Sequence, residues 1–354
     1  MKAFIQRAFP VPRVLIPYRV SIEISDGRLH FFEFSQSRGV LYPKTYGNIP
    51  FPRVRMSTLN EQIRAESVKV LTSFAEKYKY SSARIIIHEG EVYVFRISVP
   101  TIEHSQIRSA VEGLLEENVP ISPSEAVFEY SIVKTDVERG ETIVAVSVVS
   151  EKTLLSLVEI FTEAGIKPAA FETEARALSR SLFTENDKKV HAVLAVNDHH
   201  STVFIVQDGA VSFSSSIEVG SYDIESAVAK TFSLSPEGAR DMIYDKAFST
   251  GSEDTKLFDA MIPALSVIRD ELGKVLAYWK MQGKKEREFE DISDIVLTGP
   301  YSLISGFSKY FSISTKLPTV HASVWTRTVN PQKYLPDLSY RDSLDYGAVI
   351  GALL

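Results

Sequence analysis

The sequence predicts an α/β fold made of two similar lobes that face each other across a cleft. Two segments carry the same order of strand, turn and strand: residues 20–34, and residues 191–220, in which a third strand follows a second turn. That second turn contains Asp208-Gly209 between apolar runs, which is typical of a hairpin. Two such units, each opening one half of the chain, indicate a duplicated fold.

The two segments also correspond residue by residue. Glu23 aligns with Ala195, and Ser25 aligns with Asn197, at the turn after the first strand of each half. In such folds the backbone N–H groups of this turn point into the cleft, which is where a phosphate group would bind.

Length and composition limit the classes of protein that fit. With 354 residues, 44% hydrophobic and 24% charged, the chain suits a globular protein of two lobes. A net charge of −6 and no basic stripe argue against nucleic acid as a partner. Without cysteine there are no disulfides or thiolate metal sites. Because no apolar run approaches the ~20 residues of a membrane span, and no signal peptide is evident, we expect a cytoplasmic protein that reaches a membrane only through a partner.

The first half begins with a proline-rich lead-in, residues 1–19, expected to be extended. Residues 35–56 are expected to form a loop and an edge strand. Thr58 and Glu61 have capping-box spacing for a helix that continues to about Tyr80. Strands are predicted at 83–88 and 92–99.

A change of pattern after Val99 predicts an inserted module. Apolar residues from Ile107 to Leu115 follow helical spacing. Two alternating strands are predicted at 126–133 and 142–149. Ser150 is expected to cap a helix that ends at Gly165. A further helix, 172–182, leads to the second half.

The second half is predicted to be rich in helix after its hairpin. The helices are expected at 222–232, from Ser235-Pro236 onward, at 256–282 with a kink or division at Pro263, and at 302–310. Residues 294–297 form a predicted buried strand, and 342–354 a final helix that packs on the first lobe.

Taken together, several segments resemble the PilM family of type IV pilus assembly, which is related to FtsA and actin. The matching segments, in chain order, are FPVPRVLIPYRVSIEIS, EGLLEENVPISPSEAVFEY, AGIKPAAFETEARAL, QDGAVSFSSSIEVGSYDIESAVAKTFSLSPEGA, IVLTGPYSLISG and LDYGAVIGALL. The resemblance implies an actin-like, duplicated ribonuclease-H-like fold with a small α+β inserted subdomain. The implied division is 1–98 for the first lobe, 99–167 for the insert, 168–186 for the first lobe continued, 187–340 for the second lobe with a helical subdomain at about 222–290, and 341–354 for the C-terminal helix.

The nucleotide-binding loops of this family are altered here. Both phosphate loops of the family read Asp-Ile-Gly, and the first carries a lysine five residues beyond its glycine. This chain has Glu23-Ile24-Ser25 with His30 at the lysine position, and Ala195-Val196-Asn197. The glycine-rich nucleoside loop is replaced by Thr298-Gly299-Pro300-Tyr301.

These changes weaken a magnesium–triphosphate site for physical reasons. Ser25 and Asn197 place side chains where glycine would let the backbone approach a phosphate. Ala195 offers no oxygen for Mg²⁺, and Asp198 adds an anion. Pro300 removes a backbone donor, and Tyr301 could fill an adenine pocket.

The candidate residues of this degenerate nucleotide cleft come from both halves. They are Glu23, Ser25, Asn197, Asp198, Ser201, Thr202, Gly220, Thr298 and Gly299. Glu174 falls where the superfamily orients its hydrolytic water, so it would be catalytic only if the protein is an ATPase; a glutamate at a helix start is also ordinary. His199 and His200 are adjacent on a strand and point to opposite faces, so we predict no metal site there.

The resemblance implies a non-catalytic or weakly nucleotide-binding scaffold, peripheral at the inner membrane. Its partner would be the short N-terminal cytoplasmic peptide of a PilN-like membrane protein, bound between the first lobe and the insert near residues 119–125, with the pilus motor ATPases as further candidates. An active Mg-ATP-dependent ATPase or switch is the main alternative. A type II secretion component of the GspL family is another; the end of the chain at Leu354 without a membrane span disfavours it.

Overall fold

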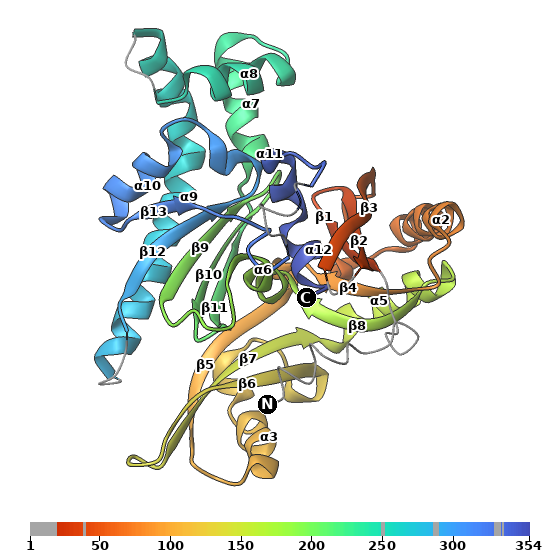
Figure 1. The fold of residues 1–354 in the computed structure, drawn as a ribbon, viewed down its shortest axis with the longest axis vertical. Helices are drawn as coiled ribbons and strands as arrows, with labels where there is room; N and C mark the ends of the chain where they lie inside the picture. Colours follow the sequence, from red (N-terminus) through yellow and green to blue (C-terminus); the bar gives the residue numbers. More distant parts are fainter. Residues whose placement is uncertain (1–19, 38–39, 249–251, 286–289, 329–333, 335) are drawn as a thin grey trace.

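Two lobes with a helical pair between them make up the molecule (Figure 1). The computed structural model describes residues 20–37, 40–248, 252–285, 290–328, 334 and 336–354, so the predicted extended lead-in lies outside the described residues. In Figure 1 the first lobe carries β1–β4, and the second lobe carries β9–β13 with a helical extension above them.

The first lobe is built on a five-stranded mixed sheet in the order β3-β2-β1-β4-β8. The strands are β1 (Val20–Ser25), β2 (Arg28–Ser37), β3 (Val40–Pro50), β4 (Ser82–Ile87) and β8 (Lys167–Thr173). β1 and β2 form an antiparallel hairpin with Ile22 opposite Phe31, whereas β4 and β8 are parallel to their neighbours. The predicted edge strand is confirmed as β3, while β8 has no counterpart in the prediction.

The second lobe repeats this sheet. Its order is β11-β10-β9-β12-β13, from the strands β9 (Val190–Val196), β10 (Ser201–Gln207), β11 (Ala210–Ile217), β12 (Ile292–Thr298) and β13 (Thr319–His321). The first three strands are antiparallel, and β12 and β13 are parallel to their neighbours, as in the first lobe. Equal order and equal strand direction confirm the predicted duplication.

Several helix boundaries differ from the predictions for identifiable reasons. α2 (Glu61–Tyr78) is capped by Asn60, whose side chain accepts the Ile63 N–H, so the predicted capping box at Thr58 is wrong. α9 (Ser252–Lys285) continues through Pro263 as one helix, without the division considered. A 3-10 turn at 300–303 precedes α10 (Phe307–Thr315), which replaces the helix expected at 302–310.

Other helices follow the predictions closely. α7 (Ser221–Phe232) is followed by α8 (Pro236–Lys246), and the Ser235 hydroxyl accepts the Gly238 N–H as the predicted cap. α7, α8 and α9 form the helical extension of the second lobe (Figure 1).

The inserted module contains a three-stranded sheet. Its order is β5-β7-β6, from β5 (Val92–Pro100), β6 (Ala126–Asp136) and β7 (Glu141–Ser150), and the short helices α3 (His104–Glu112) and α4 (Leu115–Asn118) cover one face. α5 (Glu151–Glu163) starts at the Ser150 cap, as predicted. However, Leu157, Ile160 and Phe161 of α5 belong to the core of the first lobe. Strand pairing joins residues 92–150 in one sheet, although Val92, Val94 and Val149 pack in the core of the first lobe. The division at 99–167 stays a prediction.

The two lobes are joined through α6 (Glu174–Leu182) and α12 (Gly347–Gly351), which follows the short α11 (Tyr340–Ser343). Val349 and Ile350 are fully buried in the core of the first lobe, so the predicted packing of the C-terminal helix is confirmed. The two helices are in backbone contact, because a Cβ on Gly351 would lie 1.8 Å from the carbonyl oxygen of Ala177.

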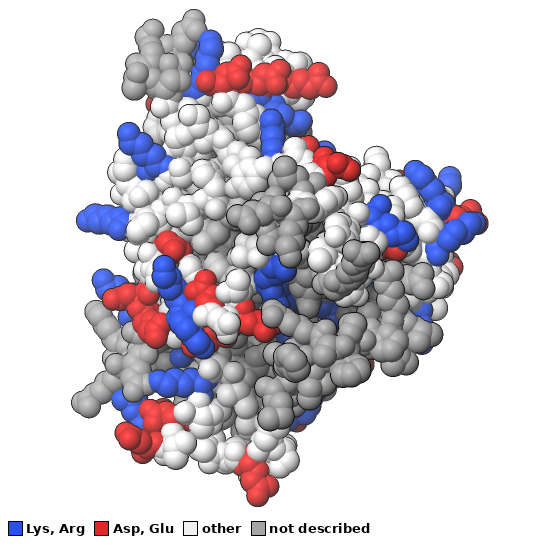
Figure 2. All heavy atoms as spheres, viewed as in Figure 1, with Lys and Arg blue, Asp and Glu red and all other residues white. Residues whose placement is uncertain are grey.

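The described surface has no segregation of charge on the face drawn in Figure 2, and the described helices are not of the membrane-spanning type. Acidic and basic side chains are interspersed on the face shown in Figure 2. No helix among the described residues has the length and apolar character that crossing a bilayer requires.

The close contact of α6 and α12 generates a stability prediction. Gly351→Ala should destabilise the protein by about 2–4 kcal/mol, since the new methyl group overlaps backbone atoms that cannot move without separating the helices. Gly273→Ala is the matched control, because nothing lies within 4 Å of its Cβ position in α9. It should stabilise the protein by about 0.5–1 kcal/mol through helix propensity. Chemical denaturation measures both, and equal effects of the two variants would contradict the contact.

Candidate functional site

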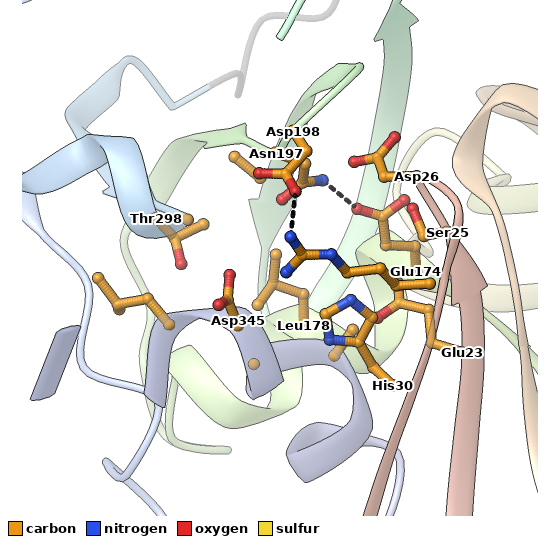
Figure 3. A pocket seen from close by; sticks show the side chains of 16 residues that line it. Glu23, Ser25, Asp26, His30, Glu174, Leu178, Asn197, Asp198, Thr298 and Asp345 are labelled. Atoms are coloured by element: carbon orange, nitrogen blue, oxygen red, sulfur yellow. Dashed lines mark hydrogen bonds and ion pairs between the residues drawn. The ribbon is translucent and has the colours of Figure 1, made fainter. Parts of the chain in front are cut away.

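The candidate site lies where the β1–β2 turn of the first lobe faces the β9–β10 turn of the second, above the start of α6 (Figure 3). A cavity of about 50 Å³ remains between them. Seven of the residues selected from the sequence line this cavity: Glu23, Ser25, Glu174, Asn197, Asp198, Thr298 and Gly299. The duplicated fold therefore brings together residues that are far apart in the chain.

Three other selected residues do not line the cavity. Ser201 is buried and donates its hydroxyl to the carbonyl of Val219 at 2.7 Å. The Thr202 hydroxyl is buried, with no hydrogen-bond partner in the described part of the chain. Gly220 instead lets the β9–β10 turn lie against α7, since a Cβ there would be 2.5 Å from the carbonyl oxygen of Asp198.

Gly299, the remaining glycine of the nucleoside loop, also serves the fold. Its φ of +86° belongs to the left-handed region, and a Cβ would lie 2.3 Å from the carbonyl oxygen of Val196. Tyr301, two residues further along the chain, is buried, and its hydroxyl donates a hydrogen bond to Glu225. Glu225 also accepts two hydrogen bonds from Arg240, at 2.7 and 3.1 Å. A cavity of about 220 Å³ stays open beside Tyr301 and Arg341.

A buried histidine links the two lobes at the centre of the site. His200 follows the β9–β10 turn and is 2% exposed. Its Nδ1 lies 2.9 Å from Asp26 of the β1–β2 turn, and its Nε2 lies 3.4 Å from Glu174 at the start of α6. The Asn197 amide donates to the other oxygen of Glu174 at 3.1 Å, a contact drawn in Figure 3. Three elements from both lobes thus meet on one imidazole ring.

The charges of this group support one another. Burial alone would lower the pKa of His200, but Glu174 and Asp26 outweigh it and hold that pKa well above its ordinary value. Burial would likewise raise the pKa of Asp26, yet the hydrogen bond from His200 lowers it to about 2. For Glu174, His200 also outweighs burial and lowers the pKa. The two carboxylates therefore favour the imidazolium form of the ring.

Two more buried carboxyl groups lie near this centre. Burial, and next the charge of Glu174, raises the pKa of Glu23 well above its ordinary value, which favours the neutral form of this carboxyl. Burial raises the pKa of Glu89 to about 7. Glu89 accepts the Ala175 N–H at 2.9 Å and the hydroxyl of Ser214, which belongs to the second lobe. The base of the cleft is thus closed by hydrogen bonds within the protein.

Further contacts cross the cleft nearer the surface. Arg28 of the first lobe lies 3.5 Å from Asp198 of the second. Arg55 pairs with Glu218 across the same gap. His199 contacts Arg53 and lies against the Tyr222 ring, with 4.6 Å between centroids. The side chains of His199 and His200 therefore have different neighbours: Arg53 and Tyr222 for the first, Asp26 and Glu174 for the second.

The residues present fit a magnesium–triphosphate poorly. Asp198 already pairs with Arg28 beside the cavity, and Asn197 is hydrogen-bonded to Glu174. The cavity of about 50 Å³, together with the adjoining cavity of about 220 Å³ that shares Arg28, Asp198 and Asp345 with it, is below the ~300–1,000 Å³ of usual ligand pockets. His30, at the position of the family's lysine, is buried, and burial lowers its pKa to about 4, so it supplies no positive charge.

Sequence reasoning missed Asp26, Arg28, Glu89 and Asp345, which all lie in or beside the cleft. Asp26 carries the one available signal, an Asp-Gly pair at the hairpin turn, and its φ of +55° is typical of such a turn. The role of Glu89 depends on contacts with residues 85 and 125 positions away. No local pattern indicates such contacts.

Comparisons with known proteins agree with this architecture. The structure is similar to a PilM–PilN type IV pilus biogenesis complex, with a TM-score of 0.74, 17% identity, and 95% and 98% of the two chains covered. It is also similar to ADP-bound MreB5 of Spiroplasma citri, with a TM-score of 0.55, 13% identity and 94% of each chain covered. A third similar structure is ethanolamine utilization protein EutJ from Carboxydothermus hydrogenoformans, with a TM-score of 0.50, 13% identity, and 98% of this chain and 91% of that chain covered. No curated protein matches the chain.

The predicted actin-like fold is confirmed by these similarities, all of them below 25% identity. The family described as type IV pilus assembly protein PilM matches residues 21–346, which is nearly the whole chain. The chain therefore belongs to the PilM family.

Proposed function

We propose that this protein is a cytoplasmic scaffold of a type IV pilus or related assembly machine, and that it acts by binding a partner and not by hydrolysing ATP. The observation that carries this proposal is the buried contact of His200 with Asp26 and Glu174. The resemblance to the actin-like superfamily implies a nucleotide site between the two lobes at this place, and MreB5, which shares the fold, is bound to ADP. Here side chains of the protein bridge the two lobes.

Electrostatics favours this view. An uncompensated charge in a protein interior costs several kcal/mol, so the acidic groups of the cleft need a cation or a proton. The raised pKa of His200 favours a positive charge between Asp26 and Glu174, and the raised pKa of Glu23 favours its neutral form. A triphosphate would bring several negative charges next to these carboxylates and to Asp198, without a lysine or a glycine loop to hold them.

The partner that the family favours is a PilN-like inner-membrane protein. A structural relative is a PilM–PilN complex, which supports a partner of this type for our chain. We propose that the short N-terminal cytoplasmic peptide of such a protein binds between the first lobe and the insert, near residues 119–125, and holds this chain at the inner membrane. Contact with the pilus motor ATPases would extend the same role.

A magnesium-dependent ATPase or switch remains the second candidate, since ADP-bound MreB5 shares the fold. Glu174 would then position water, and the altered loops would hold nucleotide through Ser25 and Asn197. A component related to GspL would use the same fold in type II secretion. Direct binding measurements separate these functions.

The partner proposal predicts peptide binding that does not need nucleotide. A synthetic peptide of the N-terminal cytoplasmic segment of a PilN-like protein should bind with micromolar or tighter affinity in calorimetry or fluorescence anisotropy. Millimolar Mg-ATP should change the Kd by less than about twofold, because a ligand that does not bind shifts no equilibrium. Absence of detectable peptide binding would remove the scaffold proposal. Saturable Mg-ATP binding that Asn197→Trp abolishes would establish the ATPase alternative.

The contact of His200 with Asp26 and Glu174 predicts a large loss of stability when the imidazole is removed. His200→Ala leaves Asp26 and Glu174 buried without their counter-charge, so the free energy of unfolding should fall by about 3–5 kcal/mol. His199→Ala is the matched control at the neighbouring position and should cost less than about 1 kcal/mol. Urea denaturation measures both, and a His200 effect no larger than that of His199 would show that the bridge contributes little.

The burial of Asp345 in the cleft predicts that this residue lowers the free energy of unfolding in a pH-dependent way. Burial, and next the charge of Asp198, raises the pKa of this carboxyl from 3.8 to about 7. A carboxyl with a raised folded pKa stabilises the fold while protonated, and this contribution is lost as the pH rises from about 4 to about 7. Asp345→Asn should therefore be more stable than the parent by about 1–2 kcal/mol at pH 8. The difference should shrink toward pH 5 in denaturation curves; a constant difference would contradict the raised pKa.

A further inference from the structure

A second, larger cavity lies beside the β1–β2 turn and is separate from the proposed partner groove. Its volume is about 620 Å³, and it shares only Ser25 and Asp26 with the smaller cleft cavity. Among the acidic and histidine residues that line it, Asp26, His88 and His200 from the two lobes lie close enough together to share one metal ion. His88 directly follows β4, so all three side chains sit at the ends of strands of the two sheets.

The donor atoms of these three residues are close together. One ligand atom from each lies within 4.8 Å of the others. Asp26 Oδ1 is 2.9 Å from His200 Nδ1, and the rings of His88 and His200 are 4.2 Å apart with an interplanar angle of 54°. Zn²⁺ binds nitrogen at ~2.0–2.1 Å and carboxylate oxygen at ~2.0–2.2 Å, so only a small convergence of these side chains is needed.

The surroundings of His200 are those of a metal-binding histidine. Ligating histidines usually donate their second ring N–H to a carboxylate, which fixes the ring and its tautomer. Glu174 has this relation to His200: it lies 3.4 Å from Nε2, on the side of the ring away from Asp26. Glu174 is itself 3% exposed and held by the Glu89 N–H at 3.3 Å and by Asn197 at 3.1 Å. The Asn197 amide nitrogen also lies 2.9 Å from Nε2, so this amide donates to Glu174 alone when Nε2 is a donor. With Nε2 as donor, the lone pair of Nδ1 is directed toward Asp26.

One ring nitrogen of His88 is already engaged. Its Nδ1 accepts the Gly90 N–H at 2.9 Å, so Nε2 is the nitrogen that can bind an ion without breaking this bond. His88 has no carboxylate within ion-pairing distance among the described residues, in contrast to His200. It is therefore the ligand whose loss disturbs the metal-free protein least.

We propose that Asp26, His88 and His200 form a binding site for a divalent transition-metal ion of the zinc type. Two imidazoles and one carboxylate suit Zn²⁺ or Co²⁺ better than Mg²⁺ or Ca²⁺, which prefer oxygen. The ion replaces the proton on His200 Nδ1, which leaves through the 620 Å³ cavity, and water from that cavity fills the open coordination position. Because Asp26 and His88 belong to the first lobe and His200 to the second, the bound ion fastens the lobes together.

The test uses the full-length protein after chelation and dialysis. Titration with ZnCl₂ in a calorimeter should give one equivalent of binding, and Zn²⁺ should raise the Tm, because a ligand that binds only the folded state stabilises it. Titration with CoCl₂ should produce visible absorption from nitrogen and oxygen coordination. His88→Ala should weaken Zn²⁺ affinity about tenfold or more. His199→Ala, one residue from the site but directed toward Arg53, should leave Zn²⁺ affinity unchanged.

A second variant guards against misfolding. Asp26→Asn keeps the size of the side chain and should also weaken Zn²⁺ binding, with circular dichroism confirming that both variants are folded. Lack of saturable Zn²⁺ or Co²⁺ binding overturns the proposal. So does binding that neither His88→Ala nor Asp26→Asn weakens, which would indicate adventitious surface histidines. The assay needs no peptide partner, so its outcome is independent of the scaffold proposal.

Discussion

The arrangement of the cleft depends on one buried cation between two carboxylates. Asp26 and Glu174 come from different elements of the first lobe, and neither could stay ionised in the interior without compensation. His200 of the second lobe is the group that compensates both. This requirement fixes the distance between the β1–β2 turn, the β9–β10 turn and the start of α6. It also determines where Asn197 and Glu89 find their hydrogen-bond partners.

This centre is continuous with the insert. The 3-10 turn at 89–91 starts beside His200 and Glu174 and leads without a linker into β5. β5 in turn reaches the second lobe, where Arg96 donates to Gln207 at 2.7 Å. The insert is therefore attached to the cleft at one end and to the second lobe along its edge strand. A partner held by the insert would consequently be mechanically coupled to the relation between the lobes, without any nucleotide.

Features of the fold that depend on neighbouring residues in the chain could be predicted from the sequence. The duplicated hairpins, the Ser150 and Ser235 caps and the C-terminal helix follow from periodicity and turn chemistry. Predictions failed where tertiary contacts decide: Pro263 is accommodated within a 34-residue helix, and β8 is a strand because β4 offers it a parallel edge. For the site, the turns were located correctly, but the bridge was not, since Asp26 and His200 are 174 residues apart. These two residues come together only because the two halves fold against each other across the cleft.

The glycines separate the demands of the fold from those of a nucleotide. Gly220 and Gly299 stand where a Cβ would collide with the protein's own backbone, at 2.5 and 2.3 Å. Ser25 and Asn197 stand at the two phosphate-loop positions where the family has glycine, and where only a bound phosphate would need the side chain to be absent. The two glycines that the backbone requires are therefore present, and the two positions that a phosphate would require to be glycine are not. This difference supports the proposal that the chain acts without binding triphosphate.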